Sequence, residues 1–206
     1  MKIYLIVGNN VNLGSFSFER GSLKIGVDHG AFLALSNGVD LDYAVGDFDS
    51  CDSSERDLIF QKVKHVILLN PIKDETDTNY AYQEFKDQKD VSFVILGGIT
   101  GKRIEHFYAN LELVMKDERV CLLDNDTLIS QISHDVSWKK DEYHYLSFFP
   151  IEEEAILSLR GFAYEGEKIL LKKGKGLGIS NEIVKEEAHL ILNKGKLLCF
   201  RSKNDN

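Results

Sequence analysis

Short runs of β-branched and other apolar residues alternate with longer stretches of helical period from Met1 to about Asn125. This alternation is typical of repeated βα units around a mainly parallel sheet, because parallel neighbours need a crossover that a helix supplies. We therefore expect a Rossmann-like α/β domain in this part of the chain. The expected strands are Lys2–Val7, Lys24–Val27, Tyr43–Val45, His65–Leu69, Phe93–Leu96 and Val120–Leu123. The expected helices are Ala31–Ser36, Ser54–Val63, Thr76–Phe85 and Glu105–Lys116.

The pattern changes after Ser133, where short extended runs follow one another without helical segments between them. The glycine-rich separators Gly174–Gly178 and Asn193–Gly195 suit hairpin turns. We expect an antiparallel β-sandwich or barrel here, and a domain boundary between about Ser133 and Tyr143. The expected strands are Tyr145–Phe149, Ala155–Leu159, Ile169–Leu171, Glu187–Leu192 and Lys196–Phe200.

Composition excludes several classes of protein. The net charge of -8 argues against a nucleic-acid partner, because phosphate backbones need clustered Lys and Arg. The three cysteines are widely separated and form no CxxC pair, which argues against a zinc cluster or a disulfide framework. No stretch approaches the ~20 apolar residues that cross a bilayer, so we expect no membrane partner and a cytoplasmic location.

Two carboxylates follow the expected strand Tyr43–Val45, in the segment Gly46-Asp47-Phe48-Asp49-Ser50. If the backbone remains extended, its period of two sends Asp47 and Asp49 to one side and Phe48 toward the core. Paired hard oxygen ligands suit Mg²⁺. The alternative is that both residues cap a turn entering the helix near Ser54.

A second acidic segment, Lys73-Asp74-Glu75-Thr76-Asp77, follows the strand His65–Leu69. One helical turn presents Asp74 and Asp77 on the same face. The alternative is that Asp74 caps the next helix in an acidic variant of the capping box. In a parallel sheet both acidic segments leave the same edge, and four gathered carboxylates would repel one another without cations.

A glycine-rich loop, Gly97-Gly98-Ile99-Thr100-Gly101-Lys102-Arg103, lies between a strand and a helix. Small residues let backbone N–H groups approach an anion, and the helix N-terminus and two cations favour phosphate. The spacing does not match a Walker A loop or a GxGxxG motif. The alternatives are a simple tight turn, and for His106 a surface or packing histidine.

Two further segments carry polar side chains at turns. Asp28 ends another strand and either adds a carboxylate to the same sheet edge or caps the helix Ala31–Ser36. Ser180 and Asn181 offer a hydroxyl and an amide suited to a heteroaromatic ring, although such pairs are also ordinary turn residues.

Taken in order, the segments VDHG, GDFDS, DETD, GGITGKRIEH and GISN resemble the thiamine pyrophosphokinase family over nearly the whole chain. The family's corresponding segments are ADGG, GDFDS, DxTD, GxxGxRxDH and GxSN-like. The chain departs from this pattern at Val27, His29 and Glu105.

The resemblance implies an ATP-binding α/β domain over residues 1–135, a thiamine-binding β domain over residues 136–206, and a homodimer with thiamine near the subunit interface. It implies that Asp47, Asp49, Asp74 and Asp77 bind Mg²⁺, that Asp47, Asp49 and Asp77 are catalytic, and that Ser180 and Asn181 contact thiamine. The implied ATP-binding residues are Asp28, Gly97, Gly98, Thr100, Gly101, Arg103 and His106.

The implied reaction is Mg²⁺-dependent transfer of pyrophosphate from ATP to the thiamine hydroxyl, which gives thiamine pyrophosphate and AMP. One alternative is a pyrophosphokinase for a hydroxymethylpterin, because the same carboxylate and loop chemistry serves any primary alcohol. Another is a non-catalytic nucleotide or thiamine sensor, although a sensor has little need for so many metal-binding carboxylates.

Overall fold

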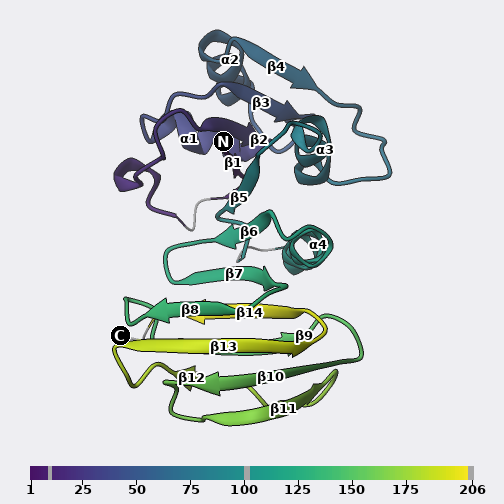
Figure 1. Ribbon diagram of the computed structural model, residues 1–206. Helices are drawn as coiled ribbons and strands as arrows, with labels where there is room; N and C mark the ends of the chain where they lie inside the picture. The colour runs from purple at the N-terminus through teal and green to yellow at the C-terminus, as the bar shows by residue number, and fades with distance from the viewer. Residues whose placement is uncertain (9–10, 100–102, 204–206) are drawn as a thin grey trace. The chain divides into compact units, whose positions relative to one another are not determined.

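A computed structural model describes residues 1–8, 11–99 and 103–203 (Figure 1). Thr100 and Gly101 therefore lie outside the described residues. The chain divides into two compact units, of which the first comprises Met1–Leu113 and Leu122–Asn125 and the second Val114–Cys121 and Asp126–Asn206. This division precedes the expected boundary, because the segment Thr127–Ile132 forms a strand that pairs with a strand near the C-terminus.

The first unit contains a parallel sheet, as the alternating pattern predicts. Its strands lie in the order β5-β1-β2-β3-β4, and every neighbouring pair is parallel. The chain adds β2, β3 and β4 on one side of β1 and then returns to place β5 on the other side. The carboxyl ends of β1 and β5 thus form the kind of switch point where open α/β sheets bind ligands. The strands are β1 (Lys2–Ile6), β2 (Leu23–Val27), β3 (Tyr43–Gly46), β4 (His65–Leu68) and β5 (Ser92–Leu96).

Helices connect these strands, and their caps decide between two interpretations of the acidic segments. Helix α2 has Asp52 as its N-cap in a complete capping box with Glu55. Helix α3 has Thr76 as its N-cap, with Asp77 as its first residue. The suggestion that Asp74 caps α3 is therefore wrong. Asp47 and Asp49 do not cap α2, but the side chain of Asp47 does cap the turn that leads to this helix, because it accepts from the Asp49 N–H. The helices are the 3₁₀ turn η1 (Leu13–Ser15), α1 (His29–Ser36), α2 (Ser53–Lys62), α3 (Asp77–Phe85) and α4 (Ile104–Lys116), which precedes strand β6 (Val120–Leu123).

The second unit is an antiparallel sandwich, as expected. One sheet has the order β12-β9-β14-β7 and the other the order β11-β10-β13-β8. The aromatic side chains of Trp138, Phe148 and Phe162 pack together in the core between them. The strands are β7 (Thr127–Ile132), β8 (Val136–Lys139), β9 (Tyr145–Pro150), β10 (Glu154–Arg160), β11 (Gly166–Lys172), β12 (Asn181–Glu182), β13 (Glu187–Lys194) and β14 (Leu197–Ser202).

The glycine-rich turns of this unit do not form hairpins, which corrects the sequence interpretation. The turn at Gly174–Gly178 leads from β11 in one sheet to β12 in the other, and Asn193–Gly195 leads from β13 to β14 in the same way. Gly174 and Gly195 do adopt positive φ, of 74° and 80°. The prediction that the chain turns at these glycines was therefore correct. The two strands that each turn joins lie in different sheets, however, because such a turn can connect two sheets as well as two neighbouring strands.

None of the helices in the described residues is long and apolar enough to cross a membrane.

Candidate active site

Three carboxylates meet at the carboxyl edge of the parallel sheet. Asp28 follows β2, and Asp47 and Asp49 follow β3. One oxygen of each side chain lies within 4.8 Å of one oxygen of the others. The structure thus brings Asp47 and Asp49 together, and Asp28 adds its carboxylate to the same sheet edge, which is the first of the two alternatives that the sequence left open for it. A cluster of this kind presents three hard oxygen ligands to a divalent cation.

Asp47 and Asp49 converge through a turn, and the extended backbone expected from the sequence is not present. Phe48 has a φ of 55°, and the backbone N–H of Asp49 donates to Asp47 Oδ1 at 3.1 Å. Phe48 is nevertheless fully buried and packs with Ile59 and Ala44. Burial of this aromatic ring fixes the turn, so the two flanking carboxylates remain on the side away from the core.

Asp28 leaves one carboxylate oxygen without a protein partner. Its Oδ2 accepts a 2.6 Å hydrogen bond from Ser50 Oγ, whereas Oδ1 is buried and has no hydrogen-bond donor. Asp28 occupies the N-cap position of α1 but makes no side-chain cap, and its backbone has a φ of 50° and a ψ of −130°. A buried, unpaired carboxylate oxygen on a strained backbone is costly unless a cation binds it.

The close approach of Asp28 to the neighbouring loop explains a glycine of the GDFDS segment. A Cβ added at Gly46 would lie 3.0 Å from the Cα of Asp28. The backbone N–H of Asp28 donates to Val45 O at 2.8 Å, which holds the two loops at this spacing. Gly46 therefore lets the carboxylates of the two loops converge.

Lys73 connects the cluster to a fourth carboxylate. Its Nζ lies 2.7 Å from Asp47 Oδ2 and 3.2 Å from Asp77 Oδ1. Burial raises the pKa of Asp47, but hydrogen bonds from Lys73 and from the Asp49 N–H outweigh it, so the pKa falls below its ordinary value. Burial lowers the pKa of Lys73, but its bonds to both carboxylates outweigh that effect and raise the pKa overall.

Asp77 has the opposite balance. Burial raises its pKa, Lys73 opposes the rise, and the negative charges of Asp47 and Asp28 add to it, so the pKa lies above the ordinary value. A carboxylate in this environment takes up a proton more readily than an exposed one.

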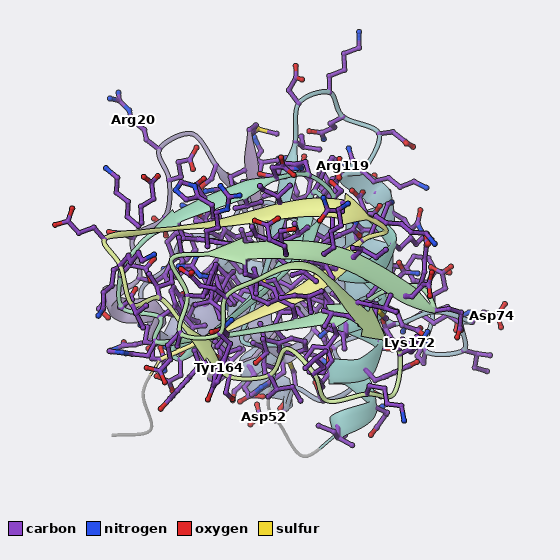
Figure 2. All side chains as sticks on the ribbon, turned by 60° about the horizontal axis from the view of Figure 1, so that its bottom comes forward. Arg20, Asp52, Asp74, Arg119, Tyr164 and Lys172 are labelled. Carbon is purple, nitrogen blue, oxygen red and sulfur yellow. The ribbon has the colours of Figure 1, made fainter. Side chains whose placement is uncertain are left out.

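Asp74 lies apart from this cluster. Its side chain is exposed in the loop before α3 and points outward from the ribbon in Figure 2. Because the helix begins at Asp77, Asp74 and Asp77 do not share a helical turn, and the sequence argument for placing them on one face was wrong.

A pocket with a volume of about 370 Å³ adjoins the carboxylates. It lies at the switch point, where Gly8 follows β1 and Gly97 follows β5. A Cβ at Gly8 would lie 2.2 Å from Gly97 O, so only glycine permits these loops to pack this closely. The lining residues are Val7, Gly8, Val27, Asp28, His29, Leu33, Ser50, Asp77, Thr78, Gly97, Gly98, Arg103, His106, Phe107 and Asn110.

The expected phosphate-binding side chains line this pocket. Arg103 and His106 are exposed, and Arg103 Nε donates to Glu105 Oε1 at 3.1 Å. Glu105, which differs from the aspartate of the family motif, therefore contacts the arginine of that motif. Gly98 also lines the pocket, with its carbonyl 3.4 Å from the buried Asn110 Nδ2.

Ser180 and Asn181 have different environments in the second unit. Ser180 is exposed and has a φ of 53°. Asn181 is 3% exposed, and its amide is bound to backbone. Its Oδ1 accepts from the N–H groups of Tyr164 and Glu182 at 3.0 Å each, and its Nδ2 donates to Tyr164 O at 3.0 Å.

Sequence reasoning assigned no role to Lys73, Ser50 or Asn110. The signal for Asn110 is its spacing in α4, because it precedes the apolar residues Leu113 and Val114 by three and four positions, which places an amide on the inner face of an amphipathic helix. Lys73 and Ser50 stand within the quoted acidic segments, but spacing alone does not show which way their side chains point.

Comparison with known proteins identifies the family. Residues 17–122 match the family model "Thiamin pyrophosphokinase, catalytic domain", and residues 133–197 match "Thiamin pyrophosphokinase, vitamin B1 binding domain". The chain belongs to the thiamin pyrophosphokinase family. The resemblance inferred from the motifs is thereby confirmed.

Individual members of the thiamin pyrophosphokinase family are similar over most of their length. The chain is 31% identical to thiamine pyrophosphokinase of Bacillus subtilis in an alignment 192 residues long that covers 89% of this chain and 89% of that protein. It resembles a crystal structure of thiamine pyrophosphokinase from Bacillus subtilis with a TM-score of 0.89 at 30% identity, covering 99% of this chain and 100% of that one. It also resembles thiamin pyrophosphokinase from Geobacillus thermodenitrificans, with a TM-score of 0.89 at 25% identity, covering 100% and 99% of the two chains.

Proposed function

We propose that this chain transfers a pyrophosphoryl group from ATP to the hydroxyl of thiamine and releases thiamine pyrophosphate and AMP. The observation that carries the proposal is the cluster of Asp28, Asp47 and Asp49 beside a pocket at the sheet's switch point. A chain of the thiamin pyrophosphokinase family with this acidic edge has the groups that phosphoryl transfer needs, namely oxygen ligands for a metal and a pocket for a nucleotide.

ATP binds, on this proposal, in the pocket between the loops after β1 and β5. The glycines at positions 8, 97 and 98 bring backbone close to the phosphates, and Arg103 and His106 stand at the wall. Arg103 is exposed and paired only with Glu105 among the ion pairs of the described residues, so it is available to a phosphate oxygen. An arginine suits that role because its planar fork matches phosphate oxygens.

The carboxylate cluster fits a divalent cation, since the buried Oδ1 of Asp28 has no protein donor and is free to bind a cation. We assign Mg²⁺ to Asp28, Asp47 and Asp49, and we leave the exposed Asp74 out of this set. When bound there, Mg²⁺ would neutralise charge on the phosphate oxygens.

The chemical step is an in-line displacement at the β-phosphorus. The thiamine hydroxyl oxygen forms a bond to the β-phosphorus, the bond from that phosphorus to the α,β-bridging oxygen breaks, and AMP leaves with the bonding pair. The hydroxyl proton passes to Asp77, whose burial favours proton uptake. Most of the rate acceleration comes from orienting the reacting groups and neutralising their charge, because phosphoryl transfer needs little covalent chemistry from the protein.

Thiamine binding is assigned to the second unit, which matches the vitamin B1 binding domain. Ser180 is exposed and is available to a ligand, whereas Asn181 is buried and shapes the turn. We also propose that the chain is a homodimer with this region near the interface. The large apolar side chains that are exposed near Ser180 and Asn181 in the sequence support the proposed dimer interface. They are Tyr164, Leu177, Ile179 and Val184.

One assay tests the proposed function. Purified protein is incubated with MgATP and thiamine, and AMP and thiamine pyrophosphate are followed by chromatography. We expect equal amounts of both products. A hydroxymethylpterin that is pyrophosphorylated faster than thiamine would change the substrate assignment, and binding of both ligands without turnover would show a sensor.

A further inference from the structure

Ser50 connects the two loops that carry the acidic cluster. It belongs to the loop after β3, together with Asp47 and Asp49, whereas Asp28 belongs to the loop after β2. The hydroxyl of Ser50 donates to Asp28 Oδ2 at 2.6 Å, which is the length of a charge-assisted hydrogen bond to a carboxylate. Ser50 is therefore a strong hydrogen-bond donor to one member of the cluster from the loop that carries the other two.

The backbone on both sides of Ser50 fixes its position. Phe48 is fully buried and Cys51 is 7% exposed, and both belong to the same core cluster. The N–H of Cys51 donates to Phe48 O at 3.2 Å, which closes a turn around the two residues between them. Because the residues that flank this turn are anchored in the core, Ser50 is held at the carboxyl edge of the sheet.

The side chain of Asp28 is not held by its own helix. Asp28 occupies the N-cap position of α1, but its carboxylate makes no cap hydrogen bond. The terminal torsion of an aspartate has only a broad preference, so a carboxylate without partners rotates easily. The bond from Ser50 occupies Oδ2, and the buried Oδ1 is then the oxygen that remains for a cation.

We propose that Ser50 is a positioning residue that fixes the carboxylate of Asp28 so that its free oxygen, Oδ1, binds the cation of the cluster. The inference rests on the proposed function, because it concerns the metal site of that reaction. Hydrogen-bonding partners of metal ligands typically contribute about 10- to 100-fold to metal affinity, because they fix the orientation of the ligand.

The test measures Mn²⁺ binding to the full chain in the absence of nucleotide, by the electron paramagnetic resonance signal of the free ion. Ser50→Ala is expected to weaken Mn²⁺ binding about tenfold, because the carboxylate of Asp28 is no longer fixed. Ser50→Thr keeps a hydroxyl donor and is expected to restore most of the affinity. Ser53→Ala removes an exposed hydroxyl at the first residue of α2 and is the matched control, with unchanged binding.

A double-mutant cycle shows whether Ser50 acts through Asp28. Asp28→Gly removes the carboxylate, and glycine readily adopts the φ of 50° and ψ of −130° at this position, while Asp47 and Asp49 still bind the ion. In that background Ser50→Ala is expected to change Mn²⁺ affinity less than about twofold, because the group that Ser50 positions is absent. A serine that ligated the ion itself would cause the same loss in both backgrounds. Thermal unfolding of each variant checks that it is folded.

Unchanged Mn²⁺ binding by folded Ser50→Ala would overturn the inference, and so would equal losses in the two backgrounds. The same holds for a Ser50→Thr variant that binds as weakly as Ser50→Ala, and for a wild-type chain that binds no Mn²⁺ at millimolar concentration. If the variants bind Mn²⁺ as expected but no thiamine pyrophosphate forms from MgATP and thiamine, the proposed function fails and the positioning role of Ser50 stands.

Discussion

Replacing Asn181 tests whether its side-chain amide stabilises the fold or binds thiamine. The side chain is 3% exposed and makes hydrogen bonds of 3.0 Å to Tyr164 N, Tyr164 O and Glu182 N. Asn181→Ala removes all of them, at about 1 kcal/mol for each net hydrogen bond. We therefore expect a loss of about 3 kcal/mol in the free energy of unfolding of the second unit.

The assay is urea unfolding followed by the fluorescence of Trp138, which packs in the core of that unit. Ser180→Ala is the matched control, because its exposed hydroxyl is expected to contribute less than about 0.5 kcal/mol to stability. KM for thiamine should rise more in Ser180→Ala than in Asn181→Ala, when both are measured under conditions where they are folded. An Asn181→Ala variant of wild-type stability whose KM for thiamine rises tenfold would refute the structural role.

The remaining predictions concern the acidic edge, the pocket and the buried thiols. Asp49→Asn should lower kcat at least about a hundredfold without a loss of stability, because the metal then lacks a charged ligand; exposed Asp57→Asn is the control, and turnover equal to wild type in Asp49→Asn would remove Asp49 from the site. Asp77→Asn should lower kcat more than it changes KM for ATP in initial-rate measurements, since it removes the proposed proton acceptor, and a change confined to KM would contradict that role. Burial raises the pKa of the Cys51 thiol to about 11 and that of Cys199 to about 12. Because only the thiolate reacts, both cysteines should react with a disulfide reagent at pH 8 at least about a hundredfold slower in the folded protein than after unfolding, and the rate should increase as the pH rises toward these values. Fast labelling of either cysteine in the folded protein, located by mass spectrometry, would contradict the burial.

The general architecture followed from sequence pattern, because periodicity reports which residues are buried. All six strands and four helices expected before Asn125 are present, with bounds shifted by a few residues. Strands β7, β8 and β12 were missed, since short runs such as Val136–Lys139 differ little from loop sequence. The turns at Gly174 and Gly195 were recognised locally, but which sheet the next strand enters depends on packing that no turn motif encodes.

The residues of the site that could be predicted are those whose positions follow directly from the order of strands and loops. Asp47 and Asp49 follow the same strand, β3, so both reach the carboxyl edge of the sheet whether the loop is extended or turned, and their meeting was predicted correctly although the backbone was not. The prediction that Asp74 joins the cluster was wrong because it depended on where α3 begins. Thr76 is the N-cap of that helix, so Asp74 lies outside it. For Asp28 the sequence left two alternatives open, and for Lys73 it indicated no role, because spacing does not determine the directions of these side chains.

The central claim is that Asp28, Asp47 and Asp49 share one cation beside the nucleotide. Crystals grown with Mn²⁺ and a non-hydrolysable ATP analogue test it directly by anomalous diffraction. We expect a manganese peak within bonding distance of oxygens from all three carboxylates, with the analogue's phosphates in the adjoining pocket. A bound analogue with manganese elsewhere, or with none of these carboxylates as ligands, would contradict the account.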